Sequence, residues 1–185
     1  MIVSISGRPG SGKSAVAKQV AEALHLRHVS AGDFMREMAA ERGMSILELS
    51  RMAEDGDAID REIDARTVRL GNELDGFVID ARLGWHFLPG SLKVFLEVRP
   101  EVAAERIFAA GRGTEHENTD LAGTKLAIES RTASEAQRYR DYYGLDYADH
   151  SQYDLVIDTS ERTIGEVVDL IVARVGDGDL ERGVR

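Results

Sequence analysis

The eight residues from Gly7 to Ser14 limit what this chain can fold into more than any other segment. They read Gly-Arg-Pro-Gly-Ser-Gly-Lys-Ser and match the phosphate-binding pattern G-x-x-x-x-G-K-[ST] at every defined position. The apolar run Ile2–Ser6 precedes them, and apolar residues spaced three and four apart follow from Lys13. A short strand, a glycine-rich turn and an amphipathic helix in this order predict a loop that binds the phosphates of a nucleotide.

This loop supplies two kinds of ligand for a nucleotide. Its glycines let the backbone curl, so that successive N–H groups face phosphate oxygens. We expect Lys13 to reach the β- and γ-phosphates and the Ser14 hydroxyl to bind Mg²⁺, so the expected cofactors are ATP and Mg²⁺. The predicted cofactor-binding residues are Gly7, Arg8, Pro9, Gly10, Ser11, Gly12, Lys13, Ser14 and Arg112.

The rest of the chain alternates short apolar runs with helical patterns. Strands are expected at residues 2–6, 26–30, 77–80, 92–98 and 154–158, and helices follow each of them except the third. Thr159 or Ser160 is the expected cap of the last helix, and the chain from Gly176 onward is expected to fray. This order predicts an α/β fold with a five-stranded parallel sheet that has helices on both faces.

One domain is expected over residues 1–178, followed by a flexible tail at 179–185. Its core would comprise residues 1–30, 76–110 and 144–175. Residues 31–75 contain helical patterns at 33–42, 45–55 and 57–74 but no strand, which predicts a small helical acceptor-binding lobe. The polar stretch 111–120 predicts a short lid.

Composition narrows the range of partners. The chain of 185 residues has 33 acidic and 23 basic side chains, and a net charge of −10 disfavours a nucleic-acid surface. No apolar run approaches the roughly 20 residues that a membrane helix needs, and no secretory signal is expected. The absence of cysteine fits a reducing cytoplasm. We expect a cytoplasmic protein that binds small nucleotides and neither nucleic acid nor membranes.

An absent motif and the short length of the chain exclude two other classes of P-loop protein. It has no guanine-reading N-K-x-D tetrapeptide and is too short for a motor ATPase, which leaves a compact kinase. Several segments outside the loop resemble cytidylate kinases, especially the short archaeal type. These segments are residues 28–39, 59–64, 80–85, 129–131, 135–139, 142–144 and 153–160.

The resemblance implies an activity and a set of site residues. It implies transfer of a phosphoryl group from ATP to a nucleoside monophosphate, most simply CMP or dCMP, by a monomer. Arg36 and Arg82 match the arginines that hold the acceptor phosphate in that family, and Arg131 and Arg138 match a pair that embraces the transferring group. Glu135 matches an acidic residue that contacts the cytosine ring. The catalytic residues implied are Lys13, Arg82, Arg131 and Arg138, and the substrate-binding residues are Ser30, Asp33, Arg36, Asp80, Arg82, Glu135 and Arg138.

Physical chemistry supports the arginines independently. Phosphoryl transfer requires two anions to be positioned and developing charge to be neutralised, and guanidinium groups bind phosphate oxygens in pairs. Arg82 directly follows a predicted buried strand, where ligands bind in open α/β sheets. Asp80 is a second candidate for binding Mg²⁺, through a water molecule. The alternative role for Asp80 is to cap a turn. Asp33 is expected to cap the helix that carries Arg36 rather than to contact the acceptor.

Two departures leave the acceptor open. Cytidylate kinases usually carry Glu-Gly-Arg where this chain has Asp80-Ala81-Arg82, and the lid is acidic, with Glu115, Glu117 and Asp120. One alternative is a P-loop kinase that phosphorylates a hydroxyl group of another small molecule, with Asp33 or Asp80 as base. The other is a nucleotide-binding regulatory module without transfer activity.

Overall fold

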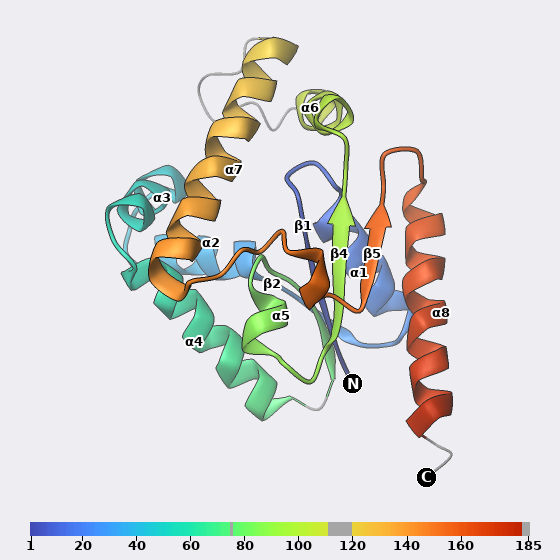
Figure 1. The fold of residues 1–185 in the computed structure, drawn as a ribbon. Coiled ribbons are helices and arrows are strands. Elements are labelled where there is room, and N and C mark those ends of the chain that lie inside the picture. Colours follow the sequence, from blue (N-terminus) through green and yellow to red (C-terminus); the bar gives the residue numbers. More distant parts are fainter. Residues whose placement is uncertain (75, 111–119, 183–185) are drawn as a thin grey trace.

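The fold was analysed in a computed structural model that describes residues 1–74, 76–110 and 120–182. Its centre is one sheet of five parallel strands in the order β2-β3-β1-β4-β5 (Figure 1). The strands are β1 (Ile2–Gly7), β2 (Arg27–Ser30), β3 (Phe77–Asp80), β4 (Leu92–Glu97) and β5 (Leu155–Asp158). The predicted α/β fold with a five-stranded parallel sheet is therefore confirmed.

The register of the strands brings their carboxyl ends together. Ser30 at the end of β2 lies opposite Asp80 at the end of β3, and Asp80 lies opposite Ile5 of β1. On the other side of β1, Gly7 lies opposite Leu96 of β4. The glycine-rich turn therefore begins at the centre of this edge, between the residues that follow β3 and those that follow β4.

Helices cover both faces because the strands are apolar on both. Helices α1 (Lys13–Ala23) and α8 (Ile164–Arg182) lie on one face, where Val16, Val20, Val167 and Ile171 pack on the sheet. The other face is covered by α2 (Ala31–Glu41), α4 (Ala58–Glu73), α5 (Gly84–Phe87) and α7 (Leu121–Tyr143) (Figure 1). Such two-sided burial is the rule for parallel sheets.

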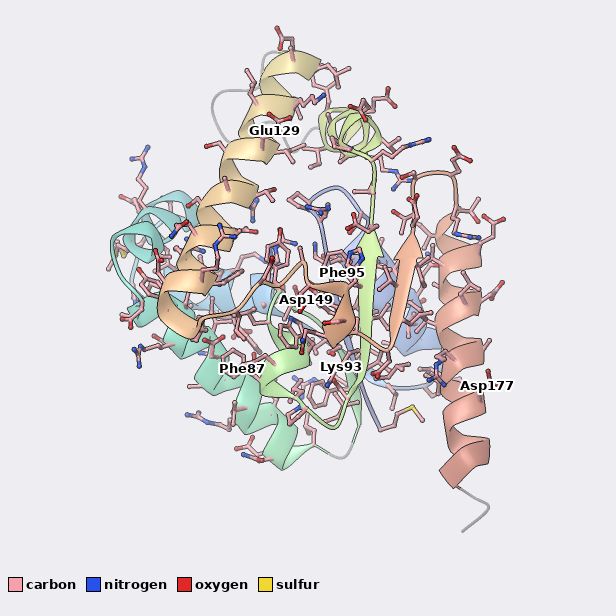
Figure 2. The ribbon with its side chains drawn as sticks, viewed as in Figure 1. Phe87, Lys93, Phe95, Glu129, Asp149 and Asp177 are labelled. Atoms are coloured by element: carbon pink, nitrogen blue, oxygen red, sulfur yellow. The ribbon has the colours of Figure 1, made fainter. Side chains whose placement is uncertain are left out.

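Two further helices complete this arrangement. Helix α3 (Ile46–Asp55) packs with α2 and α4 around a separate apolar cluster that includes Met38, Leu49 and Ile59. Helix α6 (Pro100–Ala109) follows β4, and α7 extends from α6 toward α4 (Figure 1). The connection from α7 to β5 contains a short 3₁₀ helix, η2 (His150–Gln152), and lies beside Phe95 of β4 (Figure 2). Among the described residues, no helix is both long and apolar enough to cross a membrane.

The ends of three helices differ from the predictions. Ser30, not Asp33, caps α2, because its hydroxyl accepts a hydrogen bond from the Gly32 N–H. Helix α8 begins later than predicted and is capped by Thr163 rather than by Thr159 or Ser160. Helix α8 also continues to Arg182, past Gly176, where the chain was expected to begin to fray. No proline follows Val175, and glycine alone weakens a helix without ending it.

The structure also shows how α7 begins and ends, and it contains two short helices that the sequence did not predict. Gly144 ends α7 in the left-handed conformation that favours glycine. Asp120, assigned to the lid, is the N-cap of α7 and accepts a hydrogen bond from the Gly123 N–H at 2.7 Å. Helix α5 and η2 were not predicted, because segments of three or four residues show too little periodicity to be recognised. Arg112 and the remainder of the predicted lid lie outside the described residues.

The cap of α8 gives a test of this helix boundary. Thr163 and Glu166 form a reciprocal capping box, with the Glu166 carboxylate 2.7 Å from the Thr163 nitrogen. We expect Thr163→Ala to lower the free energy of unfolding by about 1 kcal/mol, whereas Thr163→Ser keeps the hydroxyl and should change it by only a few tenths. Urea denaturation of the three proteins measures this. An unchanged Thr163→Ala variant would place the helix start elsewhere.

Candidate active site

The glycine-rich loop is held closely against helix α6. Gly10 has a φ of +76°, and a Cβ atom at this position would lie 2.7 Å from the Ala103 Cα. Only glycine fits there, both for its backbone conformation and for the contact. The Ser11 hydroxyl is buried and has no hydrogen-bond partner among the described residues. A buried polar group without a partner is costly, and a phosphate oxygen would satisfy it.

Lys13 lies across this loop. Its Nζ donates hydrogen bonds to the carbonyl oxygens of Gly7 and Arg8, at 3.0 and 3.2 Å. Burial, reinforced by the positive charge of Arg82, lowers the pKa of Lys13 well below its usual value. The neighbouring carboxylates of Glu135 and Asp80 oppose that shift only in part. A bound phosphate would give this ammonium group the anionic partner that stabilises its charged form.

Arg82 is the most deeply buried cation of the site. Its side chain is 14% exposed; Nε donates to Glu135 Oε2 at 2.7 Å, and Nη1 donates to the Gly7 carbonyl oxygen. Burial disfavours the charged form, but the Glu135 carboxylate outweighs this effect and raises the pKa of Arg82. This guanidinium therefore connects β3, the phosphate-binding loop and helix α7.

Glu135 joins Arg82 to a second arginine. Its other carboxylate oxygen accepts a hydrogen bond from Arg131 Nε at 3.0 Å, and its side chain is only 10% exposed. Burial alone would raise the pKa of this carboxyl group, but Arg82 and Arg131 lower it to about 2. Arg131 itself is 65% exposed. Glu135 thus holds one buried and one solvent-facing guanidinium at the mouth of the loop.

Arg138 is the third arginine on this side. Its Nε lies 3.3 Å from Asp60 Oδ2 of α4, and both side chains are largely buried. Neither of these two atoms has a hydrogen bond of good geometry among the described residues. Burial raises the pKa of Asp60, although Arg138 opposes that shift. The pair is therefore held by charge rather than by a well-aligned bond, and it links α7 to α4.

The ends of β2 and β3 form a polar cluster beside Arg82. Asp80 accepts a hydrogen bond from the Ser30 hydroxyl at 2.9 Å, and its other oxygen lies 3.0 Å from His28 Nε2. Arg36 pairs with Asp33 on the exposed first turn of α2. A Cβ atom on Gly32 would lie 3.4 Å from the Ser30 hydroxyl and 3.7 Å from Arg36 Nη1, which places the Arg36 guanidinium next to this cluster.

The predicted residues therefore fall into two groups. Lys13, Arg82, Arg131 and Glu135 meet directly around the mouth of the loop. Arg138 lies next to them, because Asp60, its partner, also senses the charge of Glu135. Ser30, Asp33, Arg36 and Asp80 form the second group, which begins two residues from Arg82 at the end of β3.

Sequence reasoning missed the partners of these groups. His28 and Asp60 were not selected as site residues, although both lie in segments, 28–39 and 59–64, that resemble cytidylate kinases. The sheet register and the packing of α4 on α7 bring them to the site. Glu97 was also missed, although it accepts a hydrogen bond from Arg8 Nε at 2.8 Å. Glu97 lies near the carboxyl end of the predicted fourth strand, beside the loop, and this position could have identified it.

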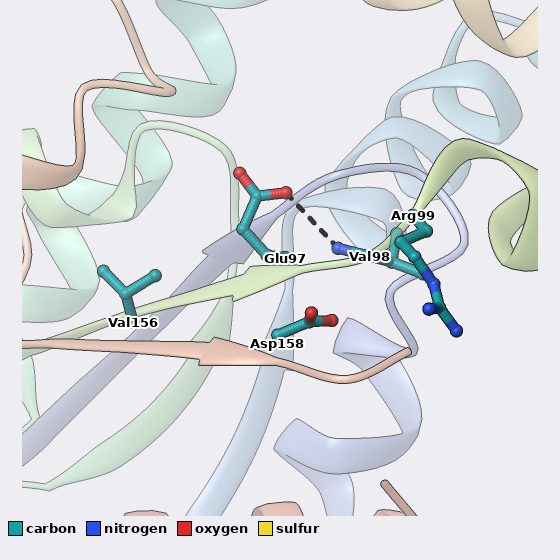
Figure 3. A pocket seen from close by; sticks show the side chains of 5 residues that line it. All are labelled: Glu97, Val98, Arg99, Val156 and Asp158. Carbon is teal, nitrogen blue, oxygen red and sulfur yellow. Dashed lines mark hydrogen bonds between the residues drawn. The ribbon is translucent and has the colours of Figure 1, made fainter. Parts of the chain in front are cut away.

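A shallow hollow lies on the other side of β1 from Asp80. It is lined by Glu97, Val98, Arg99, Val156 and Asp158, where β4 and β5 end (Figure 3). Glu97 is fixed there by Arg8 and by the Val98 N–H, 3.3 Å away. The carboxylates of Glu97 and Asp158 disfavour phosphate groups in this hollow.

The contact between α4 and α7 is expected to depend on pH. Asp64 of α4 accepts a hydrogen bond from the Tyr143 hydroxyl at the end of α7. Burial, which this hydrogen bond opposes, raises the pKa of Asp64 to about 6. The folded protein therefore retains a proton that the unfolded chain releases near pH 4. The stability that this proton contributes is complete below about pH 4 and is lost as the pH rises through about 6.

Asp64→Asn tests this dependence, because asparagine carries no charge and still accepts from Tyr143. The free energy of unfolding of the variant, minus that of the wild type, should increase by about 2 kcal/mol from pH 4 to pH 7.5. Urea denaturation at several pH values measures this difference. Tyr143→Phe removes the bond that lowers the pKa of Asp64, so it should move the midpoint of the dependence above 6. A difference that is flat across this range would contradict the assignment.

Comparison with known proteins agrees with this geometry. The model of the cytidylate kinase-like family matches residues 2–161. A cytidylate kinase of Haloquadratum walsbyi is 38% identical over 176 residues, which cover 95% of this chain and 89% of that protein. A cytidylate kinase of Methanothermobacter thermautotrophicus is 42% identical over 160 residues, which cover 86% and 96%, respectively.

Solved structures with low sequence identity share the fold. An uncharacterized protein from Eubacterium ventriosum superposes with a TM-score of 0.72 at 18% identity, covering 95% of this chain and 98% of that one. A shikimate kinase from Bacteroides thetaiotaomicron gives a TM-score of 0.64 at 15% identity, with the same coverage. These likenesses extend only to the fold, whereas the family model and the relatives extend to the sequence. This chain belongs to the cytidylate kinase-like family.

Proposed function

We propose that this protein transfers the γ-phosphoryl group of ATP to CMP or dCMP and so forms ADP and the cytidine diphosphate. The observation that carries the proposal is the position of Arg82. Its buried guanidinium lies at the carboxyl end of β3, bonded both to the first residue of the phosphate-binding loop and to Glu135. A cation there faces the donor phosphates on one side and the acceptor on the other. The family membership and the names of the relatives support the same reaction.

The residues present fit a nucleotide and its metal ion. The unpartnered Ser11 hydroxyl and the Lys13 ammonium group would meet phosphate oxygens, and Ser14, which is exposed at the start of α1, would hold Mg²⁺. When bound, Mg²⁺ neutralises charge on the β- and γ-phosphates. Asp80 is a weaker candidate than the sequence indicates, since both of its oxygens already have partners in Ser30 and His28.

The acceptor would occupy the space between the two groups of residues. Arg36 and Arg82 would bind its phosphate, with Ser30 beside Arg36. Arg131 and Arg138 would face the group in transfer. Glu135 would contact the cytidine after releasing its arginine partners. The division into a core, an acceptor lobe at 31–75 and a lid at 111–120 is part of the same proposal.

The reaction needs little covalent chemistry from the protein. An oxygen of the acceptor phosphate forms a bond to the γ-phosphorus as the bond from that phosphorus to the bridging oxygen breaks, and ADP leaves with the electron pair. The acceptor phosphate is already ionised near neutral pH, so no strong base is required. Lys13, Arg82, Arg131 and Arg138 position the two anions and neutralise charge that spreads over the transferring group.

A hydroxyl acceptor fits the site less well. It would call for a carboxylate base at Asp80 or Asp33, yet Asp80 accepts hydrogen bonds through both oxygens and Asp33 is paired with Arg36 at the surface. The shikimate kinase likeness concerns the fold alone. The cytoplasmic location and monomeric state expected from the sequence stay predictions.

A panel of acceptors tests the reaction. ADP formation from ATP and Mg²⁺ should depend on an added nucleoside monophosphate and be fastest with CMP or dCMP. If no nucleoside monophosphate supports turnover while ATP still binds, the regulatory-module alternative is correct. If a hydroxyl compound supports it instead, the acceptor assignment is wrong.

Arg82→Ala tests the residue that carries the proposal. Loss of this cation should lower kcat by about 100- to 1,000-fold, because it removes charge stabilisation in the transition state. Arg69→Ala is the matched control, since Arg69 is an exposed arginine of α4. Thermal unfolding and ATP binding confirm that the Arg82→Ala variant is folded, since it leaves Glu135 buried with only Arg131 as partner. Retention of wild-type turnover would contradict the proposal.

A further inference from the structure

The guanidinium of Arg82 has two hydrogen bonds and one aromatic contact. Its Nε donates to Glu135, and its Nη1 donates to the Gly7 carbonyl oxygen. The Arg82 Cζ also lies over the face of the Tyr147 ring, 5.6 Å from the ring centroid. This distance is within the range of a favourable cation–π contact, which strengthens when water is excluded. Among the described residues, the third nitrogen, Nη2, has no hydrogen-bond partner.

Tyr147 is fixed firmly enough to orient another side chain. It is 1% exposed and lies in the connection from α7 to β5. Its ring meets Tyr139 edge to face at 5.8 Å and packs on Phe95 at 6.4 Å. Its carbonyl oxygen accepts a hydrogen bond from the Tyr153 hydroxyl at 2.6 Å. Its backbone and its ring are therefore both held from the core side of Arg82.

The ring, not the hydroxyl, makes this contact. The Tyr147 hydroxyl is buried and has no hydrogen-bond partner among the described residues. A buried hydroxyl group without a partner does not stabilise the fold. Phenylalanine would keep every contact that the structure shows for the Tyr147 side chain. This separates the ring from the hydroxyl experimentally.

In the proposed reaction, Arg82 would donate hydrogen bonds to phosphate oxygens. Nη2 is available for this, whereas Glu135 and the Gly7 carbonyl oxygen hold Nε and Nη1. The contact with the Tyr147 ring uses none of these donors, because the π-system attracts the positive charge as a whole. Tyr147 can thus hold Arg82 in place when its donors bind a phosphate.

We propose that Tyr147 is a positioning residue that keeps the Arg82 guanidinium over its ring, in the place needed for phosphoryl transfer. This inference rests on the function proposed above. It predicts that loss of the ring slows the chemical step and leaves ATP binding almost unchanged, because Tyr147 itself touches no phosphate.

Three variants separate the effect of the aromatic ring from the effect of side-chain volume. Tyr147→Met keeps most of the volume without a π-face, and kcat with CMP should fall about tenfold with the KM for ATP within twofold of wild type. Tyr147→Phe should stay within twofold in kcat. Phe87→Leu, in the same aromatic cluster but on α5, is the control for loss of a packed ring and should keep wild-type kcat. Equal loss in Tyr147→Phe and Tyr147→Met would assign the role to the hydroxyl and overturn the proposal.

A double-variant cycle distinguishes positioning from general packing. In an Arg82→Ala background, Tyr147→Met should change kcat by less than twofold, because the residue through which it acts is gone. A tenfold loss in both backgrounds would show an independent structural role and overturn the proposal. Should Tyr147→Met not fold, phenylalanine with one and then three fluorine atoms at position 147 keeps the shape while weakening the π-face. The proposal requires kcat to fall with each step, and a flat series contradicts it.

The outcome for the wild type separates this inference from the proposed function. If wild-type protein forms no ADP with CMP or dCMP, the proposed function fails and the role of Tyr147 falls with it. If wild-type protein is active and the ring-deficient variants match it, only the inference fails.

Discussion

The buried pair of Arg82 and Glu135 is the interaction on which the rest of the site depends. An arginine with a side chain only 14% exposed is costly to bury unless its charge and its donors are satisfied. Here a carboxylate, a backbone carbonyl and an aromatic face stabilise the charge and bind two of the three guanidinium nitrogens. Each comes from a different part of the chain: Glu135 from α7, Gly7 from the start of the phosphate-binding loop, and Tyr147 from the connection to β5. One side chain thus ties three separate segments to the end of β3.

Pairing of an arginine with a carboxylate recurs around the site and explains how an acidic chain can keep cations there for binding phosphates. Besides Arg82, Arg8 is paired with Glu97, Arg36 with Asp33, and Arg138 with Asp60. Arg82 and Arg131 share Glu135, so each of these arginines has a carboxylate partner, which reduces the repulsion between the guanidinium groups. In the proposed function, these carboxylates compete with phosphate oxygens for the arginines. Among the described residues, Lys13 has no carboxylate within ion-pair distance and bonds to loop carbonyl groups instead.

Much of this could be predicted from the sequence, for reasons that differ between elements. The loop from Gly7 to Ser14 is a local motif, and the strands are short apolar runs, so both were recognisable without tertiary contacts. The spacing of Arg131, Glu135 and Arg138 placed them correctly near one another, because a helix fixes relations over four and seven residues. Family resemblance added Arg36 and Arg82, which no local pattern connects.

The remainder depended on contacts between distant segments. Asp60 reaches Arg138 across 78 positions of sequence through the packing of α4 on α7, and His28 reaches Asp80 through strand register. The cap of α2 was misassigned because Ser30 and Asp33 are both good capping residues, and only the backbone shows which N–H is bonded. Tyr147 was not selected at all, since its relation to Arg82 is visible only in three dimensions.

A crystal structure with a two-headed inhibitor that joins adenosine and cytidine through five phosphates would test the central claim most directly. The account predicts that the Arg82 guanidinium contacts the phosphate chain, that it stays over the Tyr147 ring, and that the inhibitor phosphates displace at least one of the arginine contacts of Glu135. A complex in which the adenosine phosphates fill the loop while Arg82 remains bound only to Glu135 and Gly7, away from every phosphate, would contradict it.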